Sequence, residues 1–441
     1  MLSRDNGLAR SATCQQVIGY IMFESRTRRN FAFYLTFHIL RYAFPIIVTP
    51  FLAHYLMKDV FGQYAVINSC VWSTVIFMDF GFYMYGINRL AQADSIEEIS
   101  RESSAIVSAK VALLPVCVIA YVTLITMSGM VTKCPIASMI GGFTAVGYGG
   151  TFSWYFQGRQ RGGTAVLIEG APQLVQLCLF LLLVRRPDDL WVVILIQALA
   201  PLSSVLLSVL IMRRDGLRLR IKIWSRPVAV ALRGAKPFFV ERICFSFYTA
   251  LTPTIVAMIA GVQAAAIYSI ADRANTFLGS LAVPVEQTML PVLTKVAKQD
   301  RSSWKMTMMV ASFTVSFCGM MALVVYLTIG IIIGTFFSET YQAAIPTARI
   351  FCIAAFVSSI AAALSNFVII PRGASSILIW SALTALCVSL LLQLCLIPQY
   401  GAAGAATARL GAESVTVVIL SIRAVRLFSE TKADQVEAAV L

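Results

Sequence analysis

The stretch AAIYSIADRANTFLGSLAVPV, residues 265–285, is long and apolar enough to cross a membrane, yet it carries an acid and a base near its middle. A helix of about 20 mostly apolar residues spans the hydrocarbon core of a bilayer. A charged side chain at the bilayer centre costs about 2.5–3.5 kcal/mol on insertion scales. We therefore expect Asp272 and Arg273 to face protein or a water-filled cavity rather than lipid.

The whole chain has the composition of a membrane protein. Of its 441 residues, 59% are hydrophobic and only 13% are charged, whereas soluble domains carry about 25% charged residues. Apolar runs recur along the chain and predict an all-α integral membrane protein. We expect about twelve transmembrane helices, at residues 31–53, 64–87, 105–127, 136–156, 165–184, 191–212, 237–260, 264–293, 305–337, 345–369, 376–397 and 401–422.

The basic residues outside these spans predict the orientation of the chain. With both termini in the cytoplasm, the cytoplasmic segments hold 24 Lys and Arg residues and the outer loops hold 4. Cytoplasmic loops carry an excess of Lys and Arg in membrane proteins. The bias therefore predicts an even number of spans with both ends inside.

The longest inner loop divides the predicted spans into two sets of six. This gives a cytoplasmic N-terminal segment, an N-lobe, a basic linker, a C-lobe and a cytoplasmic tail, at residues 1–30, 31–212, 213–236, 237–422 and 423–441. A Thr-Pro pair followed by a tyrosine recurs in both halves, at residues 49–64 and 252–268. Two repeated bundles that face each other are typical of alternating-access transporters.

The chain carries few signs of an enzyme. Its net charge is +14, which in a membrane protein reflects basic cytoplasmic loops. We therefore expect membrane lipids rather than nucleic acid as partners. It lacks a G-x-x-x-x-G-K-[ST] nucleotide loop, and no nucleophile and base are suitably placed. We expect no metal and no organic cofactor.

Charged residues deep inside the predicted spans are the candidate functional residues. A cationic cavity suits a phosphate or pyrophosphate group, because guanidinium groups bind phosphate bidentately and stay charged when buried. We expect Arg41, Arg273 and Arg409 to bind substrate. Asp79, Asp272 and Glu413 are the candidates for charge balance or ion coupling.

Spacing along the helices gives the first expectation for how these charges pair. Arg409 and Glu413 are four residues apart and can meet on one helix face. Asp272 and Arg273 are adjacent and point about 100° apart, so each needs another partner. Lys110 and Arg242 lie near the cytoplasmic ends of their spans, where long side chains can extend to the interface.

Five stretches, in this order, resemble one known family. They are RYAFPIIVTPFLAHYLMKDVFGQYAVINS (41–69), FGFYMYGINRLAQ (80–92), WYFQGRQR (154–161), AIYSIADRANTFLGSLAVPVEQTMLPVLTK (266–295) and IPQYGAAGAATARLGAE (397–413). Together they resemble the polysaccharide flippases of the MOP superfamily, the Wzx-like O-antigen and exopolysaccharide translocases.

The resemblance implies two six-helix lobes around a cation-lined cavity in the bacterial cytoplasmic membrane. It implies the transfer of undecaprenyl-pyrophosphate-linked oligosaccharides from the inner to the outer leaflet by alternating access, with an H⁺ or Na⁺ gradient as the energy source and glycan polymerase and chain-length proteins as partners. Asp272 and Arg273 fall in the fourth matching stretch and Arg409 in the fifth.

Three other functions remain open from the sequence. A drug/cation antiporter of the same superfamily favours an acidic cavity, but the six deep charges here comprise three bases and three acids. A membrane-embedded glycan polymerase needs a larger outer loop than this chain offers. A non-transporting scaffold for glycan enzymes would leave glycan export intact when it is deleted.

Overall fold

The computed structural model describes residues 44–45, 47–93, 95–159, 161–299, 304–374 and 376–440. Most of the first predicted span, Arg41 included, lies outside these residues, and only its end is seen as a helix at residues 47–55. All regular structure in the described ranges is helical. The predicted all-α fold class is confirmed.

The helices before the long inner loop form a first group, which we call the N-bundle. It comprises α3 (Lys58–Asp79), α4 (Phe82–Ala91), α5 (Ile96–Met127), α6 (Met130–Lys133), α7 (Pro135–Gly149), α8 (Ser153–Gly158), α9 (Gly162–Leu183) and α10 (Leu190–Arg214). Within it, α3 packs against α5 and α7, and α10 packs against α7 and α9.

The last helices form a second group, which we call the C-bundle. It comprises α12 (Thr252–Ala260), α13 (Val262–Gln299), α14 (Trp304–Phe336), the short 3-10 turn η1 (Glu339–Tyr341), α15 (Ala344–Ala363), the π-helical turn η2 (Leu364–Ile369) and α16 (Ser376–Val440). Here α13 and α15 pack closely, and α15 also packs against α14 and α16. Within α16, Gly401 has a φ of 55° and a ψ of −126°, so two helices meet there at a sharp turn.

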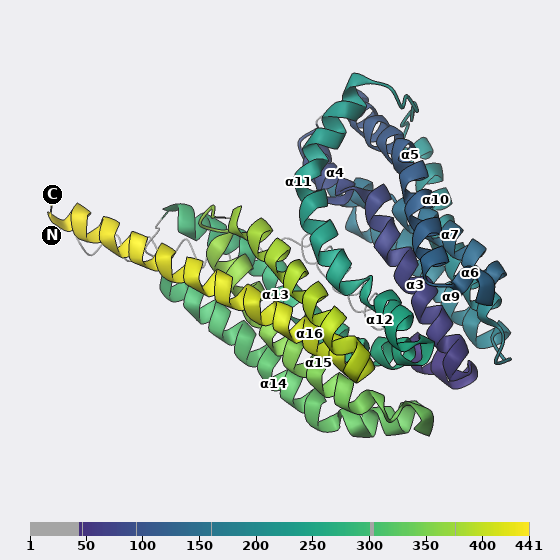
Figure 1. The fold of residues 1–441 in the computed structure, drawn as a ribbon. Coiled ribbons are helices and arrows are strands. Elements are labelled where there is room, and N and C mark those ends of the chain that lie inside the picture. Colours follow the sequence, from purple (N-terminus) through teal and green to yellow (C-terminus); the bar gives the residue numbers. More distant parts are fainter. Residues whose placement is uncertain are drawn as a thin grey trace.

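The two bundles meet at one end of the molecule and diverge toward the other (Figure 1). At the meeting end, α3 contacts α12 and α13. The Lys58 ammonium also donates a hydrogen bond to the Thr340 carbonyl at 3.3 Å, and the Phe61 ring lies edge-on to Tyr341. The diverging end carries the loop between α10 and α11, which the charge bias places in the cytoplasm.

Helix α11 (Arg226–Thr249) connects the two bundles. It packs on α3, α4 and α5 of the N-bundle and on α16 of the C-bundle. Phe239 of α11 stacks on Phe80, which lies between α3 and α4, with 4.2 Å between ring centroids. Because α11 begins at Arg226, the last part of the predicted 213–236 linker is helical and continuous with the following span. The domain boundaries themselves stay a prediction.

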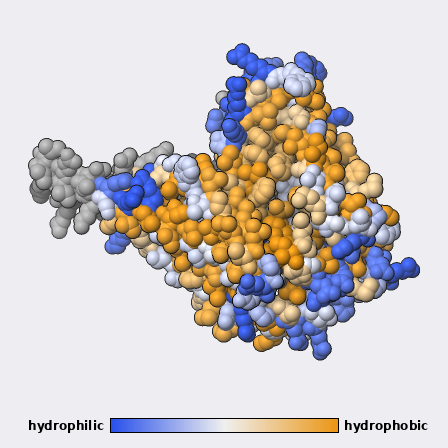
Figure 2. Space-filling model, in the orientation of Figure 1, coloured by the Kyte–Doolittle hydropathy of each residue, from blue (hydrophilic) through white to orange (hydrophobic). Residues whose placement is uncertain are grey.

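The outer surface fits a lipid environment. By length and composition, eight helical segments in the described ranges are able to cross a membrane. Figure 2 shows hydrophobic side chains covering the flanks of both bundles, with hydrophilic residues gathered toward the ends. The chain is thus a multi-pass membrane protein, and every predicted span after the first overlaps an observed helix.

Helix breaks divide several of the predicted spans. Between α3 and α4, Phe80 and Gly81 both adopt positive φ, at 44° and 78°. Glycine suits this conformation because it lacks a Cβ. A Cβ on Gly81 would lie 2.7 Å from the Phe238 Cβ of α11, so the break also admits close packing of α11.

Gly62 provides the first testable prediction, because it allows the bundles to touch. A Cβ at this position of α3 would lie 2.1 Å from the Val262 carbonyl oxygen at the start of α13. We expect Gly62→Val to separate the bundles at this end and to shift the protein toward a conformation open there. Spin labels at residues 59 and 339, in a cysteine-free background, should report a longer distance by pulsed electron resonance.

Gly334→Val is the matched control for this measurement. Gly334 lies in α14, and a Cβ there would meet nothing within 4 Å. We expect it to leave the distance unchanged. An identical distance distribution in wild type and Gly62→Val would contradict the prediction.

Candidate functional site

An ion pair between Asp272 and Arg409 joins α13 to α16 inside the C-bundle. The Arg409 Nη1 lies 3.4 Å from the Asp272 Oδ1, and the Asn275 amide donates to the same oxygen at 3.4 Å. The arginine side chain is 11% exposed and the aspartate side chain 28% exposed. The pair is therefore mostly removed from solvent, where a lone charge is costly.

Glu413 is also buried beside this pair, at 7% exposure. It lies within electrostatic range of Arg409 and next to Ser358 of α15. The sequence spacing allowed Arg409 to pair with Glu413 along one helix; the two do interact electrostatically, but the direct ion pair that Arg409 forms in the described residues is with Asp272. Tertiary packing brings α13 close enough to override the local spacing.

Arg273 is placed differently from its neighbour. It lies on α13 near the end where the bundles meet, within electrostatic range of Tyr64 on α3. Within the described ranges no carboxylate forms an ion pair with it, and no described residue accepts a hydrogen bond from its buried Nε. Arg273 is thus a guanidinium between the two bundles with hydrogen-bonding capacity left for a ligand.

Asp79 ends α3 and connects three helices. Its carboxylate oxygens lie 3.9 Å from the Lys110 Nζ of α5 and 3.3 Å from the Arg242 Nη1 of α11. Lys110 is only 4% exposed, and it donates to the Gly149 and Thr151 carbonyls at 2.8 and 3.1 Å. Asp79 therefore balances the charge of a buried lysine and ties α11 to the N-bundle.

The interfacial position expected for Lys110 is wrong. Its helix begins at Ile96, well before the predicted residue 105, so Lys110 lies about 20 Å along the helix. A capping box was the sequence signal for the true start: the Ser95 hydroxyl accepts a hydrogen bond from the Glu98 amide at 3.1 Å. By contrast, the Arg242 side chain is 51% exposed, as an interfacial residue would be.

Replacing Lys110 by methionine is expected to destabilise the protein by about 3 kcal/mol. The change leaves Asp79 with one half-exposed partner and removes the donor to two carbonyls, and unpaired buried groups carry penalties of this size. The loss of stability should appear as a lower aggregation temperature of the protein in detergent, measured by size-exclusion chromatography. Lys133→Met, at an exposed position at the end of α6, should leave this temperature nearly unchanged, and equal shifts for both variants would contradict the prediction.

The six predicted site residues thus do not form one cluster. The structure brings together Asp272, Arg409 and Glu413, and it places Arg273 next to them on the side facing α3. Asp79 belongs to a separate group with Lys110 and Arg242. Arg41 lies outside the described residues.

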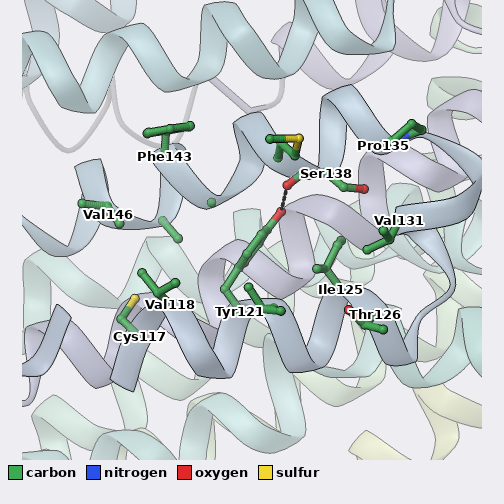
Figure 3. Close-up of a pocket in the computed structure, with 14 residues that line it drawn as sticks. Cys117, Val118, Tyr121, Ile125, Thr126, Val131, Pro135, Ser138, Phe143 and Val146 are labelled. Atoms are coloured by element: carbon green, nitrogen blue, oxygen red, sulfur yellow. Dashed lines mark hydrogen bonds between the residues drawn. The ribbon is translucent and has the colours of Figure 1, made fainter. Parts of the chain in front are cut away.

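An apolar cavity of about 520 Å³ lies apart from these charges, between α5 and α7 (Figure 3). Its walls include Val118, Val122 and Phe143. The Tyr121 side chain also lines it, and its hydroxyl donates a hydrogen bond to the Ser138 carbonyl at 2.8 Å. The cavity offers space for hydrocarbon and no group for chemistry. In the described ranges, three or more His, Cys, Asp or Glu residues nowhere gather as metal ligands.

The fold is that of MOP-superfamily transporters. The structure is similar to the "Lipid II flippase MurJ, inward closed conformation", with a TM-score of 0.65, 14% sequence identity and coverage of 92% of this chain and 90% of the other. It is also similar to an inward-facing "multidrug resistance MATE family transporter of the MOP superfamily", with a TM-score of 0.59, 12% identity and coverage of 90% and 99%. The likeness to these two structures shows a fold of two paired helical bundles.

Comparison of the sequence with known protein families shows the family to which the chain belongs. The profile described as "Polysaccharide biosynthesis protein" matches residues 27–297, more than half of the chain. The protein belongs to this family. It is also 24% identical over 401 residues to a protein of Shigella dysenteriae named "Putative O-antigen transporter", covering 90% of this chain and all of the other. The family resemblance that the five sequence stretches indicated is confirmed.

Proposed function

We propose that this protein is a flippase that carries an undecaprenyl-pyrophosphate-linked oligosaccharide, an O-antigen or exopolysaccharide repeat unit, across the bacterial inner membrane. The observation that carries the proposal is Arg273, a guanidinium between the bundles without a described ion-pair partner. Such a group suits a pyrophosphate, which it can bind with two parallel hydrogen bonds. Family membership and the O-antigen transporter relative support the glycan part of the substrate.

Alternating access follows from the arrangement of the bundles. They touch through α3, α12 and α13 at one end and diverge at the end predicted to be cytoplasmic. In this state the headgroup would enter from the cytoplasm and meet Arg273 near the closed end, while the lipid tail stays in the bilayer. Opening of the contact around Gly62 would then release the headgroup on the outer side.

The buried charges of the C-bundle are our proposed site of energy coupling. Asp272 and Glu413 share the cation Arg409, so an H⁺ or Na⁺ that neutralises one acid would change the charge of the cluster next to Arg273. Glycan polymerase and chain-length proteins are the partners that this function would require. The unpaired cation disfavours a drug/cation antiporter, because it would repel a cationic substrate.

Transport by purified protein tests the proposal. The protein would be reconstituted into liposomes with a lipid-pyrophosphate-linked oligosaccharide, and the exposure of the sugar on each leaflet would be followed with and without a pH gradient. We expect protein-dependent flipping that is accelerated by the gradient. Flipping that ignores the gradient would exclude proton coupling, and no flipping of any headgroup by folded protein would overturn the flippase proposal.

A further inference from the structure

A second cavity, which is polar, lies at the far end of the N-bundle, where the loop between α10 and α11 crosses the start of α5. Its volume is about 750 Å³. Its charged lining consists of four cations and one carboxylate: Arg101, Arg218, Arg220, Lys222 and Glu97. It is built only from α5, the loop and the start of α11, whereas Arg273 lies on α13 in the C-bundle. The basic cavity is therefore separate from the site proposed for transport.

The basic loop segment is held in place by two serines of α5. Ser104 receives a hydrogen bond from the Arg220 amide at 3.1 Å, and Ser108 receives one from the Lys222 amide at 3.0 Å. The two serine hydroxyls donate in turn to the Arg218 and Arg220 carbonyls, at 3.5 and 3.4 Å. The two serines are one helical turn apart. They fix the loop backbone so that alternate residues, Arg218, Arg220 and Lys222, line the cavity.

The three loop cations have no carboxylate partner among the residues that the structure describes. No described acid lies within ion-pairing distance of Arg218, Arg220 or Lys222, and Arg101 reaches Glu98 and Glu102 only at 3.8 Å. Cations fixed close together by backbone hydrogen bonds repel one another. A bound anion removes this repulsion, and charge-assisted hydrogen bonds to phosphate oxygens are strong.

Exposed apolar side chains occur on the same two segments that build the cavity. Trp224 is 98% exposed, Ile221 59% and Ile96 54%. Tryptophan is enriched where the lipid headgroups meet the hydrocarbon, and Ile96 itself lines the cavity. Figure 2 shows hydrophilic residues at this end directly above the hydrophobic flank of the bundle. The cavity would therefore lie at headgroup depth, with its apolar rim against acyl chains.

We propose that this basic cavity binds the phosphate headgroup of an anionic phospholipid in the leaflet facing the α10–α11 loop. Arg218, Arg220 and Lys222 would neutralise the phosphate, and Trp224 would pack against the acyl chains. Basic segments next to a membrane span attract anionic lipids in this way. The lipid would fasten the loop, and with it the start of α11, to the N-bundle. The proposal does not depend on the transport function.

Native mass spectrometry of the purified full-length protein tests it. The protein would be titrated with phosphatidylglycerol and, separately, with phosphatidylcholine, which has no net charge. We expect a preference for phosphatidylglycerol and about thirtyfold weaker binding to Arg220→Gln/Lys222→Gln, since each basic residue near an anionic surface contributes a factor of about five. Arg185→Gln/Arg186→Gln, in the exposed loop between α9 and α10, removes equal charge and should bind as wild type does.

A photoactivatable phosphatidylglycerol gives an answer that needs no substitution. In wild-type protein it should label peptides covering residues 96–108 and 215–227, with less labelling at higher salt. Equal affinity for the two lipids, equal affinity in both double variants, or labelling elsewhere would overturn the proposal. Displacement of phosphatidylglycerol by an equimolar prenyl pyrophosphate would also overturn it, because the site would then serve the substrate.

Discussion

Arg409→Leu is expected to lower the stability of the protein by about 3–5 kcal/mol, the range measured when one partner of a buried ion pair is removed. The change leaves Asp272 without its ion-pair partner and Glu413 without the nearest cation. We expect the temperature of aggregation in detergent to fall by several degrees. Adding Asp272→Asn to this variant should restore part of the loss, because no unpaired aspartate then remains.

Arg423→Leu is the matched control, on the same helix α16. Arg423 pairs with Glu430 at 2.9 Å, but the two side chains are 31% and 56% exposed. An exposed pair contributes about 0–1 kcal/mol, so this variant should resemble wild type. If Arg409→Leu is as stable as Arg423→Leu, or if the two substitutions at 272 and 409 are additive, then Asp272 and Arg409 are not energetically coupled.

Hydropathy predicts the helices of this protein well, because each span must satisfy its own backbone hydrogen bonds in lipid. Gly401 illustrates this: the predicted spans 376–397 and 401–422 are two helices that meet at that residue. The charge bias predicts an orientation, but the packing of α11 across both bundles has no signal in hydropathy. This packing depends on small residues such as Gly81 and Gly234, because a Cβ added at either position would clash with a neighbouring helix.

The sequence also indicates which charges are buried, but not how they pair. Asp272 and Arg409 are 137 positions apart, and their contact depends on the register of two packed helices, which apolar composition leaves undetermined. Residue spacing along one helix favoured Glu413 instead. Lys110 was misplaced for a related reason: the polar first turns of α5 belong to the helix, although they lie outside the apolar run.

Arg273→Gln is expected to slow flipping by about 10–100-fold without lowering stability. A hydrogen bond to a charged group contributes about 1.5–3 kcal/mol, and a bidentate arginine–pyrophosphate contact would lose at least one. Since no described acid pairs with Arg273, its removal leaves no buried charge unbalanced. The initial flipping rate in proteoliposomes should therefore fall while the aggregation temperature stays near the wild-type value. Arg409→Leu, by contrast, is expected to lower the aggregation temperature.

Two further variants separate charge from geometry. Arg273→Lys keeps the cation but loses the planar fork that binds two oxygens at once, so it should give an intermediate rate. Arg349→Gln removes an arginine of α15 that lies over the Tyr326 ring, 5.4 Å from its centroid, and should flip substrate at the wild-type rate. A wild-type rate for Arg273→Gln would remove the substrate role of this arginine. A loss of stability equal to that of Arg409→Leu would instead show that Arg273 holds the bundles together.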